Sequence, residues 1–153
     1  MKKKPHEVLW PSHAILEHLQ NPGPKVYVAG PYSPSGNNPT TMLDNMRRGI
    51  RMAARLLMIG YIPFCPFLDF MLWMTLKDGE KITKLQIQAY SLAWLRDCQA
   101  VLLLQGWHRS AGCLDEIAEA QRLGIPVFTS LKELREHFEM TRITSKRAKP
   151  KRS

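Results

Sequence analysis

The feature that most constrains the fold of this chain is a fully apolar run of five residues, Ala100 to Leu104. A strand that is apolar on both faces needs cover on both faces, which is typical of a central strand in a parallel sheet. Segments with the apolar spacing of helices lie before this run, at 82–97, and after it, at 113–123. Helices that alternate with strands indicate right-handed βαβ units. We therefore expect an α/β fold with a parallel sheet flanked by helices.

Other segments complete this alternation. Short runs rich in β-branched or aromatic residues are predicted to be strands at residues 25–29, 61–66 and 125–128. Further helices are predicted at residues 12–20, at 40–59 with Thr40 or Thr41 as cap, and at 131–138 with Ser130 as cap. Residues 67–80 are aromatic-rich and are expected to be irregular with some helix. The pattern predicts a single three-layer domain in which helices cover both faces of a parallel sheet.

The charge distribution separates the ends of the chain from its middle. The protein has 153 residues and a net charge of +9, and eight of its 22 lysines and arginines lie within residues 2–4 and 146–152. We divide the chain into an irregular lead-in (1–24), one α/β domain (25–140) and a basic flexible tail (141–153). The basic ends are expected either to be solvated or to make weak, salt-sensitive contacts with nucleic acid.

Several classes of protein are disfavoured by the sequence. No apolar run approaches the roughly 20 residues that cross a bilayer, so we expect no membrane association. The three cysteines, Cys65, Cys98 and Cys113, are odd in number and lack metal-ligand spacing. This pattern favours a reducing cytoplasm over a disulfide framework. Neither a bound metal nor an organic cofactor is expected.

Ligands of open parallel sheets bind at the carboxyl ends of the strands, and two predicted loops follow strands there. The first spans residues 30–39 and is rich in turn residues, and the second runs from Gly106 to Gly112. The first loop has neither the GxGxxG pattern of dinucleotide sites nor the P-loop pattern. A turn with Gly30 and Ser33 can still donate N–H and hydroxyl groups to a phosphate or ribose.

The second loop leads into a predicted helix and is the more informative one. Ser110 lies just before that helix, where free N–H groups and the helix dipole favour an anion. Glu116 lies about one turn into the helix, and its side chain leans back toward the same crevice. We expect the dipole to favour the ionised carboxylate, as a nucleophile requires. The alternative is a capped helix with an acidic first turn, a common structural feature.

Two further residues have both a structural and a functional interpretation. Tyr27 lies on the first predicted strand, where a tyrosine is either a core residue or a catalytic one. Asp69 is the single acid in the apolar segment 66–74. That segment is expected either to pack, in the core or at a subunit interface, or to form a lid whose aromatic rings stack on a base.

Four segments together resemble the nucleoside 2-deoxyribosyltransferase-like superfamily, over roughly residues 25 to 135. They are KVYVAGPYS at 25–33, LMIGYIPF at 57–64, SLAWLRDC at 91–98 and GWHRSAGCLDE at 106–116. The last segment resembles in particular a branch of small domains of unassigned function with a Gly-Trp-x-x-Ser-x-Gly-x-x-x-Glu signature. The resemblance implies a Rossmann-like or flavodoxin-like fold, a nucleotide substrate and assembly as a homodimer or larger homo-oligomer.

The resemblance also implies roles for individual residues. Characterised relatives cleave the N-glycosidic bond of deoxynucleosides or nucleoside 5′-monophosphates through a glutamate that attacks C1′. Glu116 matches this nucleophile, Tyr27 matches the tyrosine near it, and Ser110 matches a position that is Ser in monophosphate hydrolases and Asp in transferases. The residues that match the loop facing sugar or phosphate are Gly30, Pro31, Tyr32 and Ser33. Trp107 and Gly112 belong to the signature and are expected to bind substrate.

One position departs from the pattern of the relatives. The hydrolases carry an acid that helps protonate the leaving base, and Ser91 aligns with it. The nearest acids in this chain are Asp97 and Asp69, and Gln99 stands where an Asp commonly begins the central strand. We assign Asp69 to catalysis and Ser91 to substrate binding.

The leading prediction is hydrolysis of the N-glycosidic bond of a nucleotide, a (deoxy)nucleoside 5′-monophosphate, with Glu116 as the nucleophile. One alternative is a nucleoside deoxyribosyltransferase, which differs in the acceptor. The other is a nucleotide-binding or sensing module without catalysis, which the absence of an acid at Ser91 favours.

Overall fold

A computed structural model describes residue 20, residues 22–32 and residues 38–147 of the chain. It contains one sheet of four parallel strands in the order β2-β1-β3-β4. The strands are β1 (Lys25–Ala29), β2 (Ile62–Phe64), β3 (Ala100–Leu103) and β4 (Val127–Phe128). The predicted helix at 12–20, apart from its last residue, and Ser33 lie outside the described residues.

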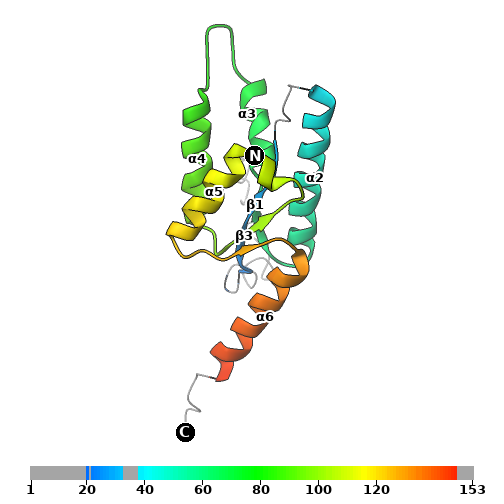
Figure 1. Ribbon diagram of the computed structural model, residues 1–153, viewed down its shortest axis with the longest axis vertical. Coiled ribbons are helices and arrows are strands. Elements are labelled where there is room, and N and C mark those ends of the chain that lie inside the picture. Colours follow the sequence, from blue (N-terminus) through cyan, green and yellow to red (C-terminus); the bar gives the residue numbers. More distant parts are fainter. Residues whose placement is uncertain (1–19, 21, 33–37, 148–153) are drawn as a thin grey trace, which may run out of the picture.

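The described part of the chain has five helices and two short 3-10 turns, all of which lie between strands except α6, which follows β4 (Figure 1). The helices are α2 (Pro39–Met58), α3 (Phe70–Met74), α4 (Lys84–Arg96), α5 (Ala111–Arg122) and α6 (Leu131–Arg147), and the turns are η1 (Pro66–Asp69) and η2 (Trp107–Arg109). None of the helices in the part of the chain that the structure describes is long and apolar enough to cross a membrane.

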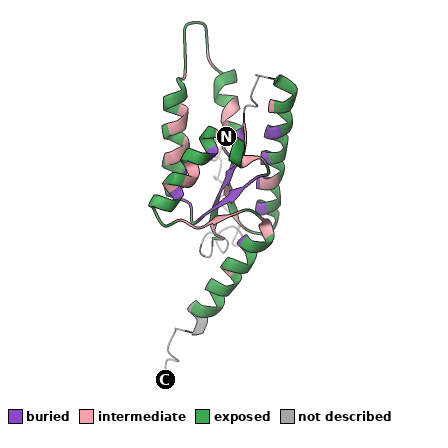
Figure 2. Cartoon of the chain, in the orientation of Figure 1, coloured by how far each residue is buried: buried purple, intermediate pink, exposed green. Residues whose placement is uncertain are grey.

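The sheet is covered on both faces, because alternate residues of each strand point to opposite sides. Val26 and Val28 of β1 pack with Leu56 of α2 and Leu134 of α6 on one face. On the other face the core contains Tyr27 and Ala29 of β1, Leu95 of α4 and Ala120 of α5. Figure 2 shows the buried strands between helices whose outer surfaces are exposed. The predicted three-layer α/β single domain is therefore confirmed.

The start of α2 differs slightly from the prediction. Asn38, rather than Thr40 or Thr41, is the cap, and its side chain accepts hydrogen bonds from both threonine N–H groups. Pro39 follows as the first helical residue, a position where the missing N–H is not needed. At the start of α4, Thr83 and Gln86 form a reciprocal capping box. Polar caps thus set the first residue of both helices.

The predicted end of the last helix at Phe138 is wrong, because α6 continues to Arg147. Residues 141–147 of the predicted tail are therefore helical. Beyond Phe138 the apolar residues Met140 and Ile143 are 67% and 52% exposed, so this part of α6 buries little against the core. Figure 1 shows it projecting away from the sheet.

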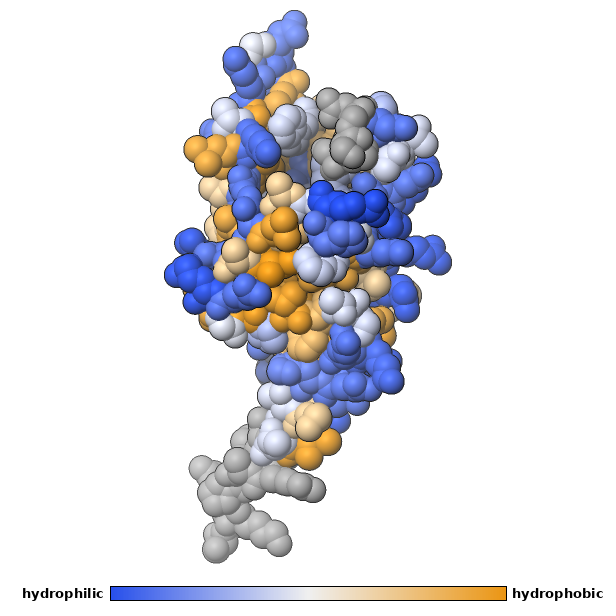
Figure 3. Space-filling model, viewed as in Figure 1, coloured by the Kyte–Doolittle hydropathy of each residue, from blue (hydrophilic) through white to orange (hydrophobic). Residues whose placement is uncertain are grey.

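Figure 3 shows the outer surface of the face nearest the viewer, where hydrophobic residues gather in the middle, beside α5, with hydrophilic residues around them.

The edge strand β4 has only two residues, both half-buried. Such a short edge presents few unpaired backbone groups for pairing with another chain.

Candidate active site at the carboxyl edge of the sheet

The two loops that the sequence singled out lie next to each other. Leu104 follows β3, and its N–H donates to the carbonyl of Ala29 at the end of β1 (2.8 Å). A Cβ added to Gly106 would lie 3.5 Å from Cγ of Pro31, so the loop after β1 contacts the loop after β3. Gly106 has a φ of +91°, a conformation that favours glycine. The adjacent ends of β1 and β3 thus bring the two loops next to each other.

Gly30 is required by packing at this point. A Cβ there would lie 3.0 Å from Cβ of Leu104 and 3.1 Å from Cζ of Phe67. Both distances are tighter than ordinary van der Waals contact. Because Gly30 has no side chain, the backbone can pass close to the Phe67 ring where β1 ends. This packing role is independent of any contact with a ligand.

Glu116 and Tyr27 form the central contact of the candidate site. The Tyr27 hydroxyl, on β1, donates a hydrogen bond of 2.6 Å to Oε1 of Glu116, on α5. Tyr27 is fully buried, and its ring stacks on Phe64 of β2 with centroids 5.4 Å apart. Glu116 is half-buried. A rigid core residue thus holds the carboxylate that the signature motif identifies.

Burial raises the pKa of Glu116 to about 7, and this exceeds the lowering effect of the Tyr27 hydrogen bond. The neighbouring Asp115 carboxylate raises the pKa further. The expectation that the helix dipole would lower this pKa is wrong, because loss of water around the carboxylate outweighs the field of the helix. At neutral pH the side chain is poised between its two protonation states.

The Tyr27 phenol remains a proton donor over the whole working pH range. Burial, followed by the Glu116 carboxylate, raises its pKa far above the usual value. Hydrogen bonding with the side chain of Ser91, on α4, acts in the opposite direction. Ser91 therefore lies beside the phenol, on the side of the layer formed by α4.

The start of α5 offers an open approach to its N–H groups. The Ser110 hydroxyl caps the helix by accepting the N–H of Cys113 (3.4 Å). A Cβ added to Gly112 would meet only that hydroxyl oxygen, at 3.9 Å, so the position is uncrowded. Helix N-termini of this kind attract anions. Trp107, on η2, is half-buried and packs against the core cluster that contains Tyr27.

Tyr32 is fixed by a residue that the sequence analysis did not identify. Asn45 of α2 is only 5% exposed, and its amide donates to the Tyr32 carbonyl (3.4 Å). Arg48 donates to the side-chain oxygen of the same asparagine. The Tyr32 ring stacks on Phe67 with centroids 6.1 Å apart. The signal in the sequence that could have identified Asn45 is that it is an amide side chain among the apolar residues of α2.

Asp69 is the second carboxyl group at this edge, whereas Asp97 caps the far end of α4 and is exposed. Oδ2 of Asp69 is buried and has no hydrogen-bond partner among the described residues. Burial raises the pKa of this carboxyl to about 6. Its charge in turn raises the pKa values of Tyr27 and Tyr32. The two acids, Glu116 and Asp69, therefore both act on the Tyr27 phenol.

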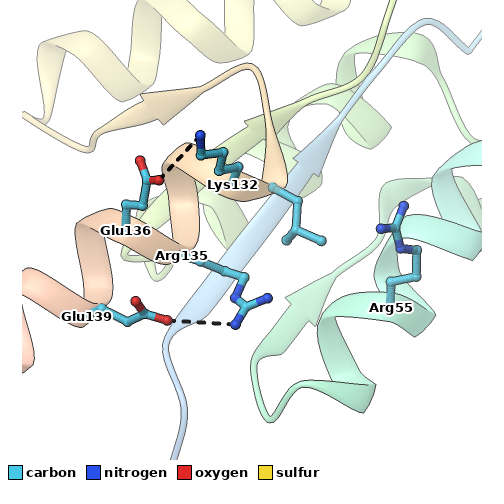
Figure 4. A pocket seen from close by; sticks show the side chains of 6 residues that line it. Arg55, Lys132, Arg135, Glu136 and Glu139 are labelled. Carbon is cyan, nitrogen blue, oxygen red and sulfur yellow. Dashed lines mark ion pairs between the residues drawn. The ribbon is translucent and has the colours of Figure 1, made fainter.

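No group of three or more His, Cys, Asp or Glu side chains that could hold a metal occurs within residues 22–32 and 38–147. A hollow of about 400 Å³ lies elsewhere, between α2 and α6 (Figure 4). Its charged walls include two ion pairs, Lys132 with Glu136 (3.8 Å) and Arg135 with Glu139 (3.7 Å). None of the residues that line this hollow belongs to the predicted site, whose residues lie at the carboxyl edge of the sheet.

A family model described as a domain of unknown function (DUF7768) matches residues 24–130, more than half of the chain. The chain belongs to the DUF7768 family. A search of curated proteins finds no match. The DUF7768 match contains all four strands and both loops of the candidate site, whereas α6 lies beyond it.

Within the DUF7768 domain, the structure places the predicted site residues in two groups. The first group centres on the Tyr27 phenol, which hydrogen-bonds to Glu116 and whose pKa is also influenced by Ser91 and Asp69. The remaining described residues, Gly30, Pro31, Tyr32, Trp107, Ser110 and Gly112, belong to the two loops and the helix start that border it. Asn45 and Phe67 are added by the structure, because their importance depends on contacts between distant segments.

Proposed function

We propose that this DUF7768 protein is a nucleotide N-glycosidase of the cytoplasm that hydrolyses a deoxynucleoside 5′-monophosphate, with Glu116 as its nucleophile. The observation that carries this proposal is the 2.6 Å hydrogen bond from the buried Tyr27 hydroxyl of β1 to Glu116 of α5. The resemblance to nucleoside 2-deoxyribosyltransferase-like proteins supports the same reaction.

The reaction proceeds in two steps, as in retaining glycosidases. In the first step a Glu116 oxygen forms a bond to C1′ of the sugar while the C1′–N bond breaks, and the electron pair leaves with the base, which takes up a proton. In the second step a water oxygen forms a bond to C1′ while the bond from C1′ to the Glu116 oxygen breaks, which regenerates the carboxylate. The water releases one proton, which balances the proton that the base took up. The products are a free base and a deoxyribose 5-phosphate.

The surroundings of Glu116 suit this task. A pKa of about 7 leaves a substantial ionised fraction at neutral pH, and a carboxylate without a cationic partner keeps its nucleophilicity. The Tyr27 hydroxyl orients the carboxylate and stabilises its charge through a single strong hydrogen bond. Charge-assisted contacts of this kind are short, as observed here.

The start of α5 supports a phosphorylated substrate. The open N–H groups beside Gly112, together with the Ser110 hydroxyl, form a neutral donor set that repels no anion. An aspartate at position 110, as in the transferases of the resembled superfamily, would repel a 5′-phosphate. Ser110 therefore favours a nucleotide hydrolase over a transferase that uses free nucleosides.

Assembly as a homodimer or larger homo-oligomer is part of the proposal. The resemblance implies it, and α3 and α4 expose several large apolar residues that suit a subunit interface. These residues are Met71, Trp73, Met74, Leu85 and Trp94, with exposed fractions of 61%, 44%, 66%, 75% and 46%.

A nucleotide-binding module without catalysis is the second candidate. The observation that favours it is Ser91, a hydroxyl beside Tyr27 at the position where the resembled hydrolases carry an acid. Such a module would bind an intact nucleotide tightly and release no base.

The test is incubation of the protein with a panel of deoxynucleoside and ribonucleoside 5′-monophosphates, followed by chromatography of the free bases. We expect release of at least one base, and loss of that release by at least about 10³-fold in Glu116→Gln, since the amide is no nucleophile. Glu119→Gln, one turn further along the same helix, is the matched control and should retain full activity. Absence of release from every substrate, or release that survives Glu116→Gln, would disprove the proposal.

A further inference from the structure

The outward face of α2 carries a row of arginines. The helix contains four arginines and a single aspartate. Arg47, Arg51 and Arg55 recur every four residues, a spacing that places side chains on one face of a helix, and all three are exposed. The buried residues of α2 lie on the opposite face, so the arginine row points to solvent.

The buried face of α2 fixes the helix in the core. Its members are Asn45, Gly49, Ala53 and Leu56. A Cβ added to Gly49 would lie 2.1 Å from Cδ2 of Phe67, so the helix backbone packs directly against that ring. The arginine row is therefore mounted on a rigid helix, and the spacing between its side chains is set by the backbone.

Few acids neutralise this row. Arg47 forms an ion pair with Asp44 (3.4 Å), but the two side chains are 79% and 60% exposed, so the pair is weak. None of the ion pairs in the part of the chain that the structure describes includes Arg51 or Arg55. The remaining arginine of the helix, Arg48, donates to a neutral amide. The face thus keeps a net positive charge.

The basic surface continues from α2 onto α6. Arg55 lines the hollow between the two helices together with Lys132 and Arg135 of α6. Glu136 and Glu139 also line it, and each pairs with one of the α6 cations. Figure 4 shows Arg55 and Arg135 on facing sides of this hollow. A ligand that spans both helices would therefore meet an excess of positive charge.

A row of cations without aromatic rings fits the phosphate backbone of a nucleic-acid duplex. A duplex carries one negative charge per roughly 1.7 Å of its axis, and lysines and arginines suffice to bind it. Surfaces for single strands add aromatic rings on which bases stack, and α2 has no aromatic residue. A helix that binds a lipid surface inserts the apolar face opposite its charges, whereas that face of α2 is buried in the protein.

The length of the row favours DNA over RNA. Arg47 and Arg55 are eight residues apart, which is about 12 Å along an α-helix. The major groove of B-form DNA is also about 12 Å wide, so the two ends of the row can contact phosphates on both sides of the groove. The major groove of A-form RNA is narrow and offers no such match.

We propose that the arginine face of α2 (Arg47, Arg51 and Arg55), extended by Lys132 and Arg135 of α6, binds the phosphate backbone of duplex DNA across its major groove. Contacts with phosphates carry no sequence information, so binding is independent of base sequence. The surface is distinct from the basic tail, and its role does not depend on the proposed glycosidase activity.

The experiment measures binding of a fluorescein-labelled DNA duplex of about 20 base pairs by fluorescence anisotropy, at NaCl concentrations from about 50 to 200 mM. The α2 variant replaces three exposed arginines by glutamine, which is also a good helix former. Two control variants remove three positive charges elsewhere, at the exposed connection between α3 and α4 and in the tail. The three triple variants are Arg47→Gln/Arg51→Gln/Arg55→Gln, Lys77→Gln/Lys81→Gln/Lys84→Gln and Lys149→Gln/Lys151→Gln/Arg152→Gln.

We expect the α2 variant to bind the duplex at least about 10-fold more weakly than the wild type at 100 mM NaCl. The slope of log K against log salt concentration should become shallower by about 2 to 3, because each lost phosphate contact removes about 0.9. Each control variant should lose less than about threefold. An RNA duplex of the same sequence should bind the wild type more weakly than the DNA duplex, and binding to vesicles containing phosphatidylserine should not depend on the α2 arginines.

The wild type provides an independent measurement that needs no variant to fold. Phenylglyoxal modifies accessible guanidinium groups, and mass spectrometry identifies the modified residues. The DNA duplex should protect Arg47, Arg51 and Arg55 from modification. It should leave Arg96 unprotected, since Arg96 lies on α4, which packs on the other face of the sheet.

Several outcomes would overturn the proposal. They are absence of duplex binding by the wild type, a loss in the α2 variant no larger than in either control, and protection of Arg96 instead of the α2 arginines. Binding of the RNA duplex or of the vesicles that equals DNA binding and requires the α2 arginines would also overturn it. All of these outcomes leave the glycosidase proposal standing, because base release is measured separately.

Discussion

Glu116 and Glu119 lie one helical turn apart on α5, and the fold gives them opposite electrostatic environments. Glu119 accepts hydrogen bonds from Arg96 of α4 (2.7 Å) and Arg122 of α5 (2.8 and 2.9 Å). Its pKa is lowered to about 2, mainly by these two guanidinium groups. Glu116 contacts a neutral phenol, and burial raises its pKa to about 7.

The pKa values of Glu116 and Glu119 differ because the two carboxylates contact different neighbours. Glu119 lies where α4 and α5 bring cations together near the solvent, so its charge is permanent and its role is to tie two helices together. Glu116 faces the sheet, where Tyr27 donates one hydrogen bond. None of the ion pairs within the described residues includes Glu116. A carboxylate saturated with cations is a poor nucleophile, whereas one that is buried and underpaired is available for reaction.

Replacement of Tyr27 by Phe tests the contact that distinguishes Glu116. Loss of a hydrogen bond to a charged group costs about 1.5–3 kcal/mol, so kcat on the nucleotide should fall by about 10- to 100-fold. Because that bond lowers the pKa of Glu116, the rising limb of the pH profile should also move to higher pH. Steady-state kinetics between pH 5 and 9 measure both effects.

Tyr61→Phe is the control for this variant, since Tyr61 packs edge-on against Phe138 on the opposite side of the sheet. It should leave kcat and the pH profile unchanged. An unchanged pH profile in Tyr27→Phe would show that the phenol does not tune Glu116.

The stability of Glu116→Gln should depend on pH. The pKa of Glu116 is 4.5 in its unperturbed state and about 7 in the folded protein, so the folded wild type loses stability as pH rises through that interval. The amide carries no charge and can still accept from Tyr27. After allowance for its partial exposure, Glu116→Gln should be more stable than the wild type by about 2 kcal/mol at pH 8.5 and about equal to it at pH 4.

Urea unfolding at the two pH values, followed by circular dichroism, measures this difference. A stability difference of the same size at both pH values would contradict the pKa shift of Glu116 and would point to altered packing instead.

Glu119→Gln should have the smallest effect and the opposite sign. The folded-state pKa of Glu119 is lowered, so its ion pairs stabilise the protein above pH 4.5 and lose this effect as pH falls through about 2. The variant should show a slightly lower unfolding midpoint at pH 7, and 1 M NaCl should remove most of the difference. A large loss that salt does not reduce would mean that Glu119 supports packing rather than an ion pair.

Much of the fold was predictable because local signals agreed with one another. The predicted strand 25–29 coincides with β1, and the apolar run 100–104 contains β3. The end of α6 was missed because the apolar pattern that predicts a helix stops at Phe138, whereas the backbone stays helical to Arg147 although its apolar residues there, Met140 and Ile143, are exposed. A helix end that makes few core contacts does not require apolar residues at helical spacing, so the apolar pattern of the sequence does not mark where the helix ends.

The candidate site was predictable in its residues but not in its electrostatics. The sequence motif identified Glu116, and the binding of ligands at the carboxyl ends of parallel strands placed its loop at the same edge as the loop after β1. The raised pKa of Glu116 depends on its burial, and the raised pKa of Asp69 depends on burial of a carboxyl group, one oxygen of which has no partner among the described residues. Both are properties of packing between segments far apart in the chain, which one sequence does not reveal.

The Phe67 ring has a consequence for how this protein can change over evolutionary time. Because no Cβ fits at Gly49 while a phenyl ring occupies position 67, a lineage that gains a side chain at 49 must accept a smaller residue at 67. That exchange would release η1 and, with it, the carboxyl group at its end. Positions 49 and 67 are therefore expected to vary together across relatives. Packing between α2 and the Phe67 ring thus restricts which substitutions can occur near the Asp69 carboxyl group at the edge of the sheet.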